Sequence, residues 1–346
     1  MQLIKPDINI DFTGKRMKGF YFSAALILIS IISLVLHRGP NYGIDFAGGT
    51  LVQVKFNQAV NLENIRSGLS TMGLEKASLQ HFGKENDNEF LIRTPSPEMT
   101  GEGFSLSIKE VLTDSTGAET EIRRIEMVGP QVGQELRKQA LLAIFYALLF
   151  ITIYISGRFE MKWMLSGITA GAMMSAVYFL SVFNVGIPFL ITAALLVSLA
   201  LFWYLNLKYA MGAVVALIHD VLITVGIFSL FGMEFSLPII AALLTIIGYS
   251  LNDTIIVFDR IRENRSHSKK ISLEKIINRS INETLSRTVL TSTTTLVVLI
   301  ALFTLGGDII HDFAFAMITG VIIGTYSSIF VASPMLLLTS PKQVVH

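Results

Sequence analysis

The sequence of 346 residues contains no cysteine. Disulfide bonds, thiolate metal sites and cysteine nucleophiles are therefore excluded, although this absence does not identify a compartment. Charged residues are also scarce: they make up 15% of the chain, whereas soluble globular proteins carry about 25%. With 52% hydrophobic residues and a mean hydropathy of +0.60, the composition is typical of a membrane protein.

Several motifs of enzymes and pumps are missing as well. The chain has no Walker loop, no Gly-x-Gly-x-x-Gly and no His-Glu-x-x-His, so an ATP-driven pump or a zinc protease has no support. The formal net charge is only +1, which gives no general attraction for nucleic acid. We therefore expect no enzyme, no cofactor, no metal site and no nucleic-acid partner.

Eight apolar segments are long enough to cross a hydrocarbon core of about 30 Å as helices, which takes roughly 20 residues each. Uninterrupted apolar runs do not alternate as barrel strands must, so helices are expected. The first segment could be a secretory signal peptide, but its length favours an uncleaved anchor. The expected spans are 20–37, 139–156, 164–183, 187–206, 210–231, 237–258, 288–306 and 312–338.

Basic residues gather on one side of these spans. Lys and Arg precede the first span and recur in the loop 259–287, whereas the short loops near Asn184, Met233 and Gly307 contain none. By the positive-inside rule, both termini (1–19 and 339–346) are expected in the cytoplasm.

The same orientation places residues 38–138 outside the membrane, ahead of the main bundle 139–338. The patterns in this polar region predict strand, helix, strand, strand, helix and strand at 51–56, 62–72, 77–82, 89–93, 104–112 and 119–127. The order βαββαβ is that of a split βαβ, ferredoxin-like sandwich.

The loop 259–287 has apolar residues at helical spacing. We expect an amphipathic helix resting on the bilayer surface with its cations near anionic lipid. A docking site for a cytoplasmic partner is the alternative. The apolar positions are Ile271, Leu273, Ile276, Ile277, Ile281 and Leu285.

Polar residues inside the spans are the candidate functional residues, because ionisable groups there are costly. Asp253, preceded by Asn252, lies about two turns inside the cytoplasmic end of the sixth span. It is either an interfacial aspartate capped by water or a carboxyl that gains and loses a proton, and we favour the second. No other span contains the pattern GYSLNDT of residues 248–254.

Arg287 opens the seventh span and is followed by a run of hydroxyl residues. Arg287, Thr291, Thr294 and Thr295 fall on one helical face. This face could line a wet path or pack closely against neighbouring helices. Arg287 could also be an anchor that snorkels to the interface.

In the fifth span, His219 and Asp220 form the deepest ionisable pair of the chain. A purely structural buried pair is possible, but side-chain charge at that depth usually faces the bundle interior, so we favour a functional role. Small residues allow helices to approach closely, and we expect this of the glycines at 167, 171, 212, 226, 248, 320 and 324.

Five motifs resemble those of the SecF family of protein-export membrane proteins. GIDFAGGT at 43–50 is similar to the start of the periplasmic region of SecD and SecF proteins. The most specific motif is GYSLNDTIIVFDRIREN at 248–264. The others are ALIHDVLIT at 216–224, SRTVLTS at 286–292 and IIGTYSSI at 322–329. The resemblance covers nearly the whole chain.

The resemblance implies a polytopic α-helical protein of the bacterial inner membrane, with about eight transmembrane helices in an RND-like bundle and one periplasmic α+β ferredoxin-like domain. It implies SecD, the Sec translocation channel, exported preproteins and further accessory membrane subunits as partners. The assembly would assist preprotein movement by using the proton-motive force. The aspartate and arginine of the family's proton pathway map onto Asp253 and Arg287, and a further aspartate lies in SecD.

The chain departs from the family in its number of spans, because SecF proteins have six. Removing residues 163–208 would restore the usual continuation, so we interpret this segment as a two-helix insertion that packs at the periphery. Two other functions stay open: a small-molecule RND-type exporter and a passive membrane scaffold or assembly factor. The region 38–138 lacks the aromatic character of a drug pocket, which disfavours the exporter.

Overall fold

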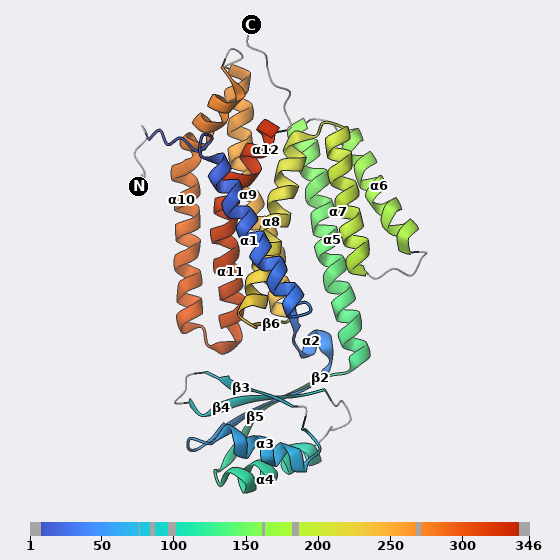
Figure 1. Ribbon diagram of the computed structural model, residues 1–346, viewed down its shortest axis with the longest axis vertical. Helices are drawn as coiled ribbons and strands as arrows, with labels where there is room; N and C mark the ends of the chain where they lie inside the picture. The colour runs from blue at the N-terminus through green and yellow to red at the C-terminus, as the bar shows by residue number, and fades with distance from the viewer. Residues whose placement is uncertain are drawn as a thin grey trace.

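Long helices form one part of the molecule, and a small sheet domain lies against one end of them (Figure 1). The structure is a computed structural model that describes residues 8–75, 77–83, 87–95, 102–160, 163–181, 187–267 and 271–338. In the described part of the chain, six helical segments are long and apolar enough to span a membrane. They are α1 (Arg16–Leu36), α5 (Pro130–Glu160), α8 (Lys208–Leu230), α9 (Leu237–His267), α10 (Leu273–Leu305) and the segment Ile310–Leu338.

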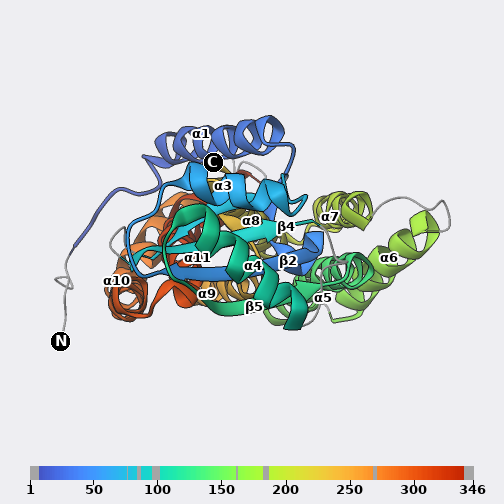
Figure 2. The same cartoon turned by 90° about the horizontal axis from the view of Figure 1, so that it is seen from below.

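The two remaining expected spans coincide with α6 (Trp163–Ser181) and α7 (Ile187–Tyr204). These two helices pack against each other and against α5, and α7 also contacts α8. Figures 1 and 2 place α6 at one edge of the bundle and α10 at the opposite edge. The outer helix α6 of the proposed insertion therefore lies opposite α10, which carries Arg287.

The last expected span, 312–338, is not one regular helix. It consists of α11 (Asp308–Ser327), a π-helical turn η2 (Ser328–Ala332) and α12 (Ser333–Leu338). Pro334 has no backbone N–H to donate to the preceding turn, which accounts for the change in winding. Ser333 instead donates its hydroxyl to the carbonyl of Ser328 at 2.7 Å.

The sheet domain contains the expected order of strands and helices. Its antiparallel sheet has the strand order β3-β4-β2-β5. Val52, Val54 and Ile92 are fully buried on the face that α3 and α4 cover, away from the bundle (Figures 1 and 2). The elements are β2 (Gly49–Phe56), α3 (Leu62–Thr71), β3 (Ser78–Phe82), β4 (Glu89–Thr94), α4 (Glu102–Thr116) and β5 (Thr120–Val128).

The boundaries of this domain differ from the expected 38–138. Residues from Pro130 onward already belong to α5. At the other side, β1 (Asn41–Tyr42) pairs with β6 (Glu234–Phe235) between α8 and α9, and α2 (Ile44–Ala47) packs on α5. These short elements are a joint between the sheet and the bundle.

The joint explains the motif at 43–50. Asp45 accepts a hydrogen bond from the backbone N–H of Leu237 at 2.8 Å, and Phe46 is buried in the bundle core. Gly49 has φ +119°, and a Cβ there would lie 2.5 Å from the Thr94 carbonyl oxygen. Only glycine fits this position without strain.

The expected loop 259–287 is largely helical, and this corrects the prediction of a helix on the bilayer surface. α9 continues to His267 and α10 begins at Leu273, so the two helices form an antiparallel hairpin. The apolar side chains of Ile276, Ile277 and Ile281 are buried in the core of this hairpin and the bundle. Because the apolar face already has a protein partner, it is not available to lipid.

Close helix packing uses some of the expected glycines. A Cβ at Gly226 would lie 2.1 Å from Ser30 of α1, and a Cβ at Gly320 would lie 2.3 Å from Ile246 of α9. Gly212 and Gly324 are similarly confined. A Cβ at Gly167, Gly171 or Gly248 would meet no other described part of the molecule within 4 Å, so the prediction was wrong for these three.

Candidate functional site: a buried carboxyl between three helices

Asp253 lies midway along α9 with its side chain inside the bundle. The residue is 1% exposed. Its Oδ2 atom is buried and has no hydrogen-bond partner in the described part of the chain. A buried carboxylate oxygen without a donor is unusual, because desolvation of a charge is costly unless hydrogen bonds replace the lost water.

The helix opposite Asp253 presents hydroxyl groups. Thr288 and Ser292 of α10 are both buried and lie one turn apart on the same helical face. Ser292 is within reach of the Asp253 carboxyl, and its hydroxyl also contacts that of Thr325 in α11 at 2.7 Å. The Thr288 hydroxyl is a second buried polar atom for which the described residues provide no partner.

Arg287 precedes this face on α10. Its charge acts on Asp253, but no ion pair within 4.0 Å joins these two described residues. Arg287 is exposed on the outer surface of the bundle. Asp253 and Arg287 therefore lie near each other, but their side chains do not form an ion pair with one another.

Two other predicted residues point elsewhere. Asn252 is exposed on the surface of α9. Thr291 donates its hydroxyl to backbone carbonyls of its own helix, at 3.0 Å from Arg287 and 2.9 Å from Thr288. Of the expected hydroxyl face, Thr295 does reach α9, where the Tyr249 hydroxyl contacts it at 3.3 Å.

His219 and Asp220 of α8 form a second buried polar group, at 3% and 0% exposure. The Nδ1 atom of His219 lies 2.8 Å from Asp220 Oδ1. Asp220 Oδ2 accepts hydrogen bonds from Ser250 of α9 at 2.5 Å and from Ser327 of α11 at 2.8 Å. Ser250 and Asp253 lie one turn apart, so α9 contacts both polar groups.

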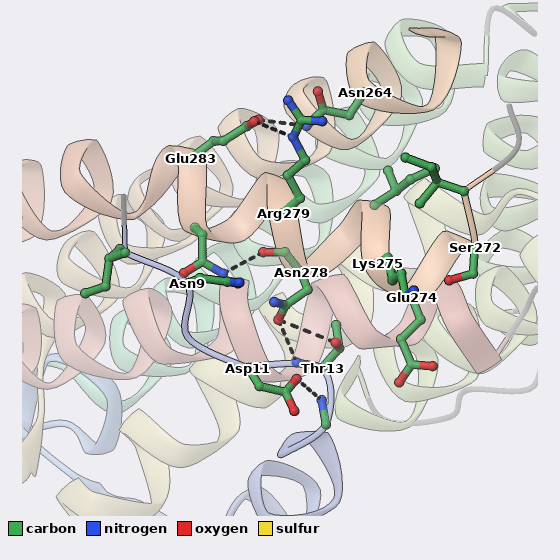
Figure 3. A pocket seen from close by; sticks show the side chains of 15 residues that line it. Asn9, Asp11, Thr13, Asn264, Ser272, Glu274, Lys275, Asn278, Arg279 and Glu283 are labelled. Atoms are coloured by element: carbon green, nitrogen blue, oxygen red, sulfur yellow. Dashed lines mark hydrogen bonds and ion pairs between the residues drawn. The ribbon is translucent and has the colours of Figure 1, made fainter. Parts of the chain in front are cut away.

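A pocket of about 740 Å³, lined mostly by polar residues, opens near the turn between α9 and α10 (Figure 3). The backbone of the N-terminal segment runs along it and is held by α10: Asn278 Oδ1 accepts from the N–H of Phe12 at 2.8 Å, and Asn282 Oδ1 accepts from that of Ile10 at 2.8 Å. These contacts fasten the start of the chain to the hairpin. In the described part of the chain, no cluster of His, Asp and Glu could hold a metal ion.

Comparison with known proteins identifies the family. The family model described as "Protein export membrane protein SecD/SecF, C-terminal" matches residues 108–197 and 181–342, and the SecD/SecF GG motif matches residues 33–60. The chain belongs to the SecF family of protein translocase subunits. The adjacent glycines Gly48 and Gly49 lie within the matched GG segment. Both have a positive φ, and a Cβ at Gly48 would lie 2.9 Å from Pro130 Cα.

Curated SecF proteins match along nearly their whole length. The protein translocase subunit SecF of Desulfurispirillum indicum is 45% identical over 341 residues, covering 97% of this chain and 93% of the relative. That of Magnetococcus marinus is 42% identical over 345 residues, covering 99% and 95%. That of Vibrio alginolyticus is 41% identical over 336 residues, covering 97% and 91%.

Solved structures of SecDF match the fold. The crystal structure of SecDF, a translocon-associated membrane protein from Thermus thermophilus, superposes with a TM-score of 0.71 at 32% identity. SecDF in a super-membrane-facing form gives a TM-score of 0.56 at 31% identity. Each comparison covers 98% of this chain and 39% of the SecDF chain. This SecF protein therefore corresponds to a minor part of the SecDF chain. As a member of the SecF family, it functions in protein export.

Sequence reasoning missed several residues of the two polar groups. Ser292 approaches Asp253 and contacts Thr325, and Ser250 and Ser327 bind Asp220. The available signal was hydroxyl residues at spacings of three and four on α10. It could not indicate which of the two hydroxyl-bearing faces turns inward.

Proposed function

We propose that this SecF protein, together with SecD, uses the proton-motive force across the bacterial inner membrane to assist preprotein movement through the Sec channel. The observation that carries the proposal is the buried Asp253 carboxyl, whose Oδ2 has no donor among the described residues although the Arg287 charge acts on it. Burial disfavours a lone charge and a guanidinium stabilises one. A small shift of α10 against α9 would therefore change the proton occupancy of Asp253.

The energy available is sufficient for such a role. A proton that moves down the membrane potential supplies about 2.3 kcal/mol per 100 mV. This is comparable to the difference of a few kcal/mol that separates two conformations of many proteins. Movement of α9 would reach the sheet domain directly, because Asp45 in the joint binds the first turn of α9.

The outer surface of α9 and α10 supports a membrane-embedded partner. Thr245 and Asn252 of α9 are exposed there, as are Arg287 and Thr294 of α10. Polar side chains are disfavoured against lipid and stabilise helix contacts. We propose that SecD covers this surface and contributes the second aspartate of the proton relay, while the Sec channel and further accessory subunits bind elsewhere.

The topology of the proposal is a periplasmic sheet domain and cytoplasmic termini, as the distribution of basic residues favours. The sheet order β3-β4-β2-β5 supports assignment to the ferredoxin-like class. We also propose eight transmembrane helices, with α6 and α7 as an insertion. The family model supports an insertion, because it matches in two segments, 108–197 and 181–342, that overlap within that region.

Export assays in inverted membrane vesicles that contain this chain and SecD test the proposal. Preprotein export should be faster with a proton gradient, and an ionophore or removal of either protein should abolish the difference. Export of small dyes in place of preprotein stimulation would favour the exporter. Equal export with and without the gradient would favour the scaffold.

A further inference from the structure

His219 and Asp220 belong to a chain of polar contacts that links α8 to α1 and α11. His219 Nε2 lies 3.1 Å from the Ser23 hydroxyl, and Ser23 lies 3.1 Å from the Tyr326 hydroxyl. Tyr326 donates to the carbonyl of Gly19 at 2.7 Å. Together with the contact between His219 and Asp220 at 2.8 Å, this makes a continuous path from Asp220 to the backbone of α1.

The donors and acceptors along this path point to its protonation. The Gly19 carbonyl can only accept, so it takes the single hydrogen of Tyr326. Ser23 must then give its own hydrogen to Tyr326, and the contact between Ser23 and His219 requires a hydrogen on Nε2. The contact with Asp220 requires another hydrogen, on Nδ1 or on the carboxyl.

A neutral imidazole beside a carboxylate holds one hydrogen, but these contacts require two. From this geometry we infer that His219 and Asp220 form a second proton-binding site, occupied by one proton and separate from Asp253. Asp220 Oδ2 accepts a hydrogen bond from Ser250 at 2.5 Å and shares the single hydrogen of Ser327 with the Gly324 carbonyl; both contacts stabilise a carboxylate. The proton therefore resides on His219, as an imidazolium with both ring nitrogens donating.

The surroundings favour this occupancy. An imidazolium and a carboxylate together have no net charge, whereas release of the proton to water leaves a net charge of −1 on a buried pair. His219 and Ser23 also border an apolar cavity of about 430 Å³, to which Phe20, Leu199 and Met335 contribute. An uncompensated charge at such a site is costly.

Other titratable groups near the pair are few in the described part of the chain. Tyr326 stacks on the imidazole with ring centroids 6.2 Å apart, and Asp253 lies one turn beyond Ser250 on α9. On the α1 side the neighbour of the imidazole is the hydroxyl of Ser23. Further along the α1–α8 contact, His37 lies near Ser229 at 3.4 Å.

The consequence concerns α1, which crosses in front of α8 and leads into the joint below the bundle (Figure 1). When the proton leaves, Nε2 becomes an acceptor. The single hydrogen of Ser23 can then serve either His219 or Tyr326, and one contact between α1 and the bundle is lost. The site therefore fastens α1 only while it holds its proton. This inference does not rest on the proposed role of Asp253.

Nitrogen NMR of the full chain in lipid nanodiscs, labelled in the histidine rings, tests the inference. His219→Gln assigns the resonances, and the exposed His267 provides a reference ring in the same sample. We expect both ring nitrogens of His219 to be protonated at pH 7. An unprotonated ring nitrogen of His219 at pH 7 in the unaltered chain would overturn the inference.

Two variants separate this site from a structural contact and from the proposed relay. Ser23→Ala removes the acceptor for Nε2–H, so the Nε2 resonance of His219 should move more than its Nδ1 resonance; an unchanged Nε2 resonance would contradict the proposed hydrogen bond to Ser23. Asp253→Asn should leave both ring nitrogens of His219 protonated at pH 7 whatever it does to export, and loss of a ring proton would show that the two sites are one. Failure of gradient-dependent export alone would leave the His219 result standing.

Discussion

Asp45, just after the first membrane helix, accepts a hydrogen bond at 2.8 Å from the backbone N–H of Leu237, the first residue of α9. This N–H belongs to the first turn of a helix, where no backbone acceptor is available, and a carboxylate there also meets the positive end of the helix dipole. The contact ties the joint of the sheet domain to the helix that carries Asp253. Movement of α9 can therefore be transmitted directly to the joint, and movement of the joint to α9.

Asp45→Ala should remove this hydrogen bond and weaken the link between the joint and α9. Loss of a capping acceptor costs about 1 kcal/mol, so hydrogen exchange of the amides in the first turn of α9 should become roughly fivefold faster. Asp45→Asn retains an oxygen acceptor and is the matched control. Equal exchange in Asp45→Ala and the unaltered chain would show that the contact does not stabilise the first turn of α9.

The Gly48–Gly49 joint allows a comparison of two glycines. Gly49→Ala places an alanine at a positive φ and brings its Cβ within 2.5 Å of the Thr94 carbonyl oxygen. Gly73→Ala also places an alanine at a positive φ, of +70°, but its Cβ has no neighbour within 4 Å. The strained backbone alone costs about 1–2 kcal/mol. Hydrogen exchange in β2 and β4 should accelerate more in Gly49→Ala than exchange near residue 73 does in Gly73→Ala. The reverse order would contradict the packing described for this joint.

Membrane sidedness can be measured because the chain has no native cysteine. Cysteines at the exposed positions Ser78 and Ser107 of the sheet domain should react with an impermeant thiol reagent in intact cells. A cysteine at the exposed Ser266 should react only after permeabilisation, since it lies at the opposite end. Labelling of Ser266 in intact cells would reverse the orientation argued from charge.

Excision of residues 163–208 should leave a protein that still binds SecD and supports export. The segment includes Phe202 and Leu207, which are buried in the bundle core. The apolar surface that it uncovers on α5 and α8 would meet lipid, which is as apolar as the lost helices. Co-purification with SecD at matched expression measures the outcome, and loss of SecD would place α6 and α7 in the working interface.

The spans and the order of the sheet domain were predictable because they depend on local patterns. Apolar length identifies α1, α5, α8, α9 and α10, and alternation with turn residues identifies β2 to β5. The hairpin between α9 and α10 was predicted as a surface helix instead. An amphipathic pattern shows that a face is buried, but it does not distinguish lipid from another helix as the covering surface.

The candidate site was predictable only in part for a similar reason. The sequence indicates that Asp253, His219 and Asp220 are costly inside a membrane. It does not indicate that Ser292 approaches Asp253 while Thr291 bonds to its own helix, because that depends on the rotation of α10. The Asp45 cap on α9 joins residues distant in the chain, and no local pattern reports it.

The most direct test of the account is gradient-dependent preprotein export by Asp253→Asn in vesicles that contain SecD. Asparagine keeps the size and polarity of the side chain but cannot titrate. Asp259→Asn, on the same helix and paired with Arg158 at 2.7 Å at the exposed end, is the matched control. We predict that Asp253→Asn assembles with SecD and loses the gradient-dependent stimulation, while Asp259→Asn retains it. Full stimulation by Asp253→Asn at normal expression would contradict the central role of this carboxyl.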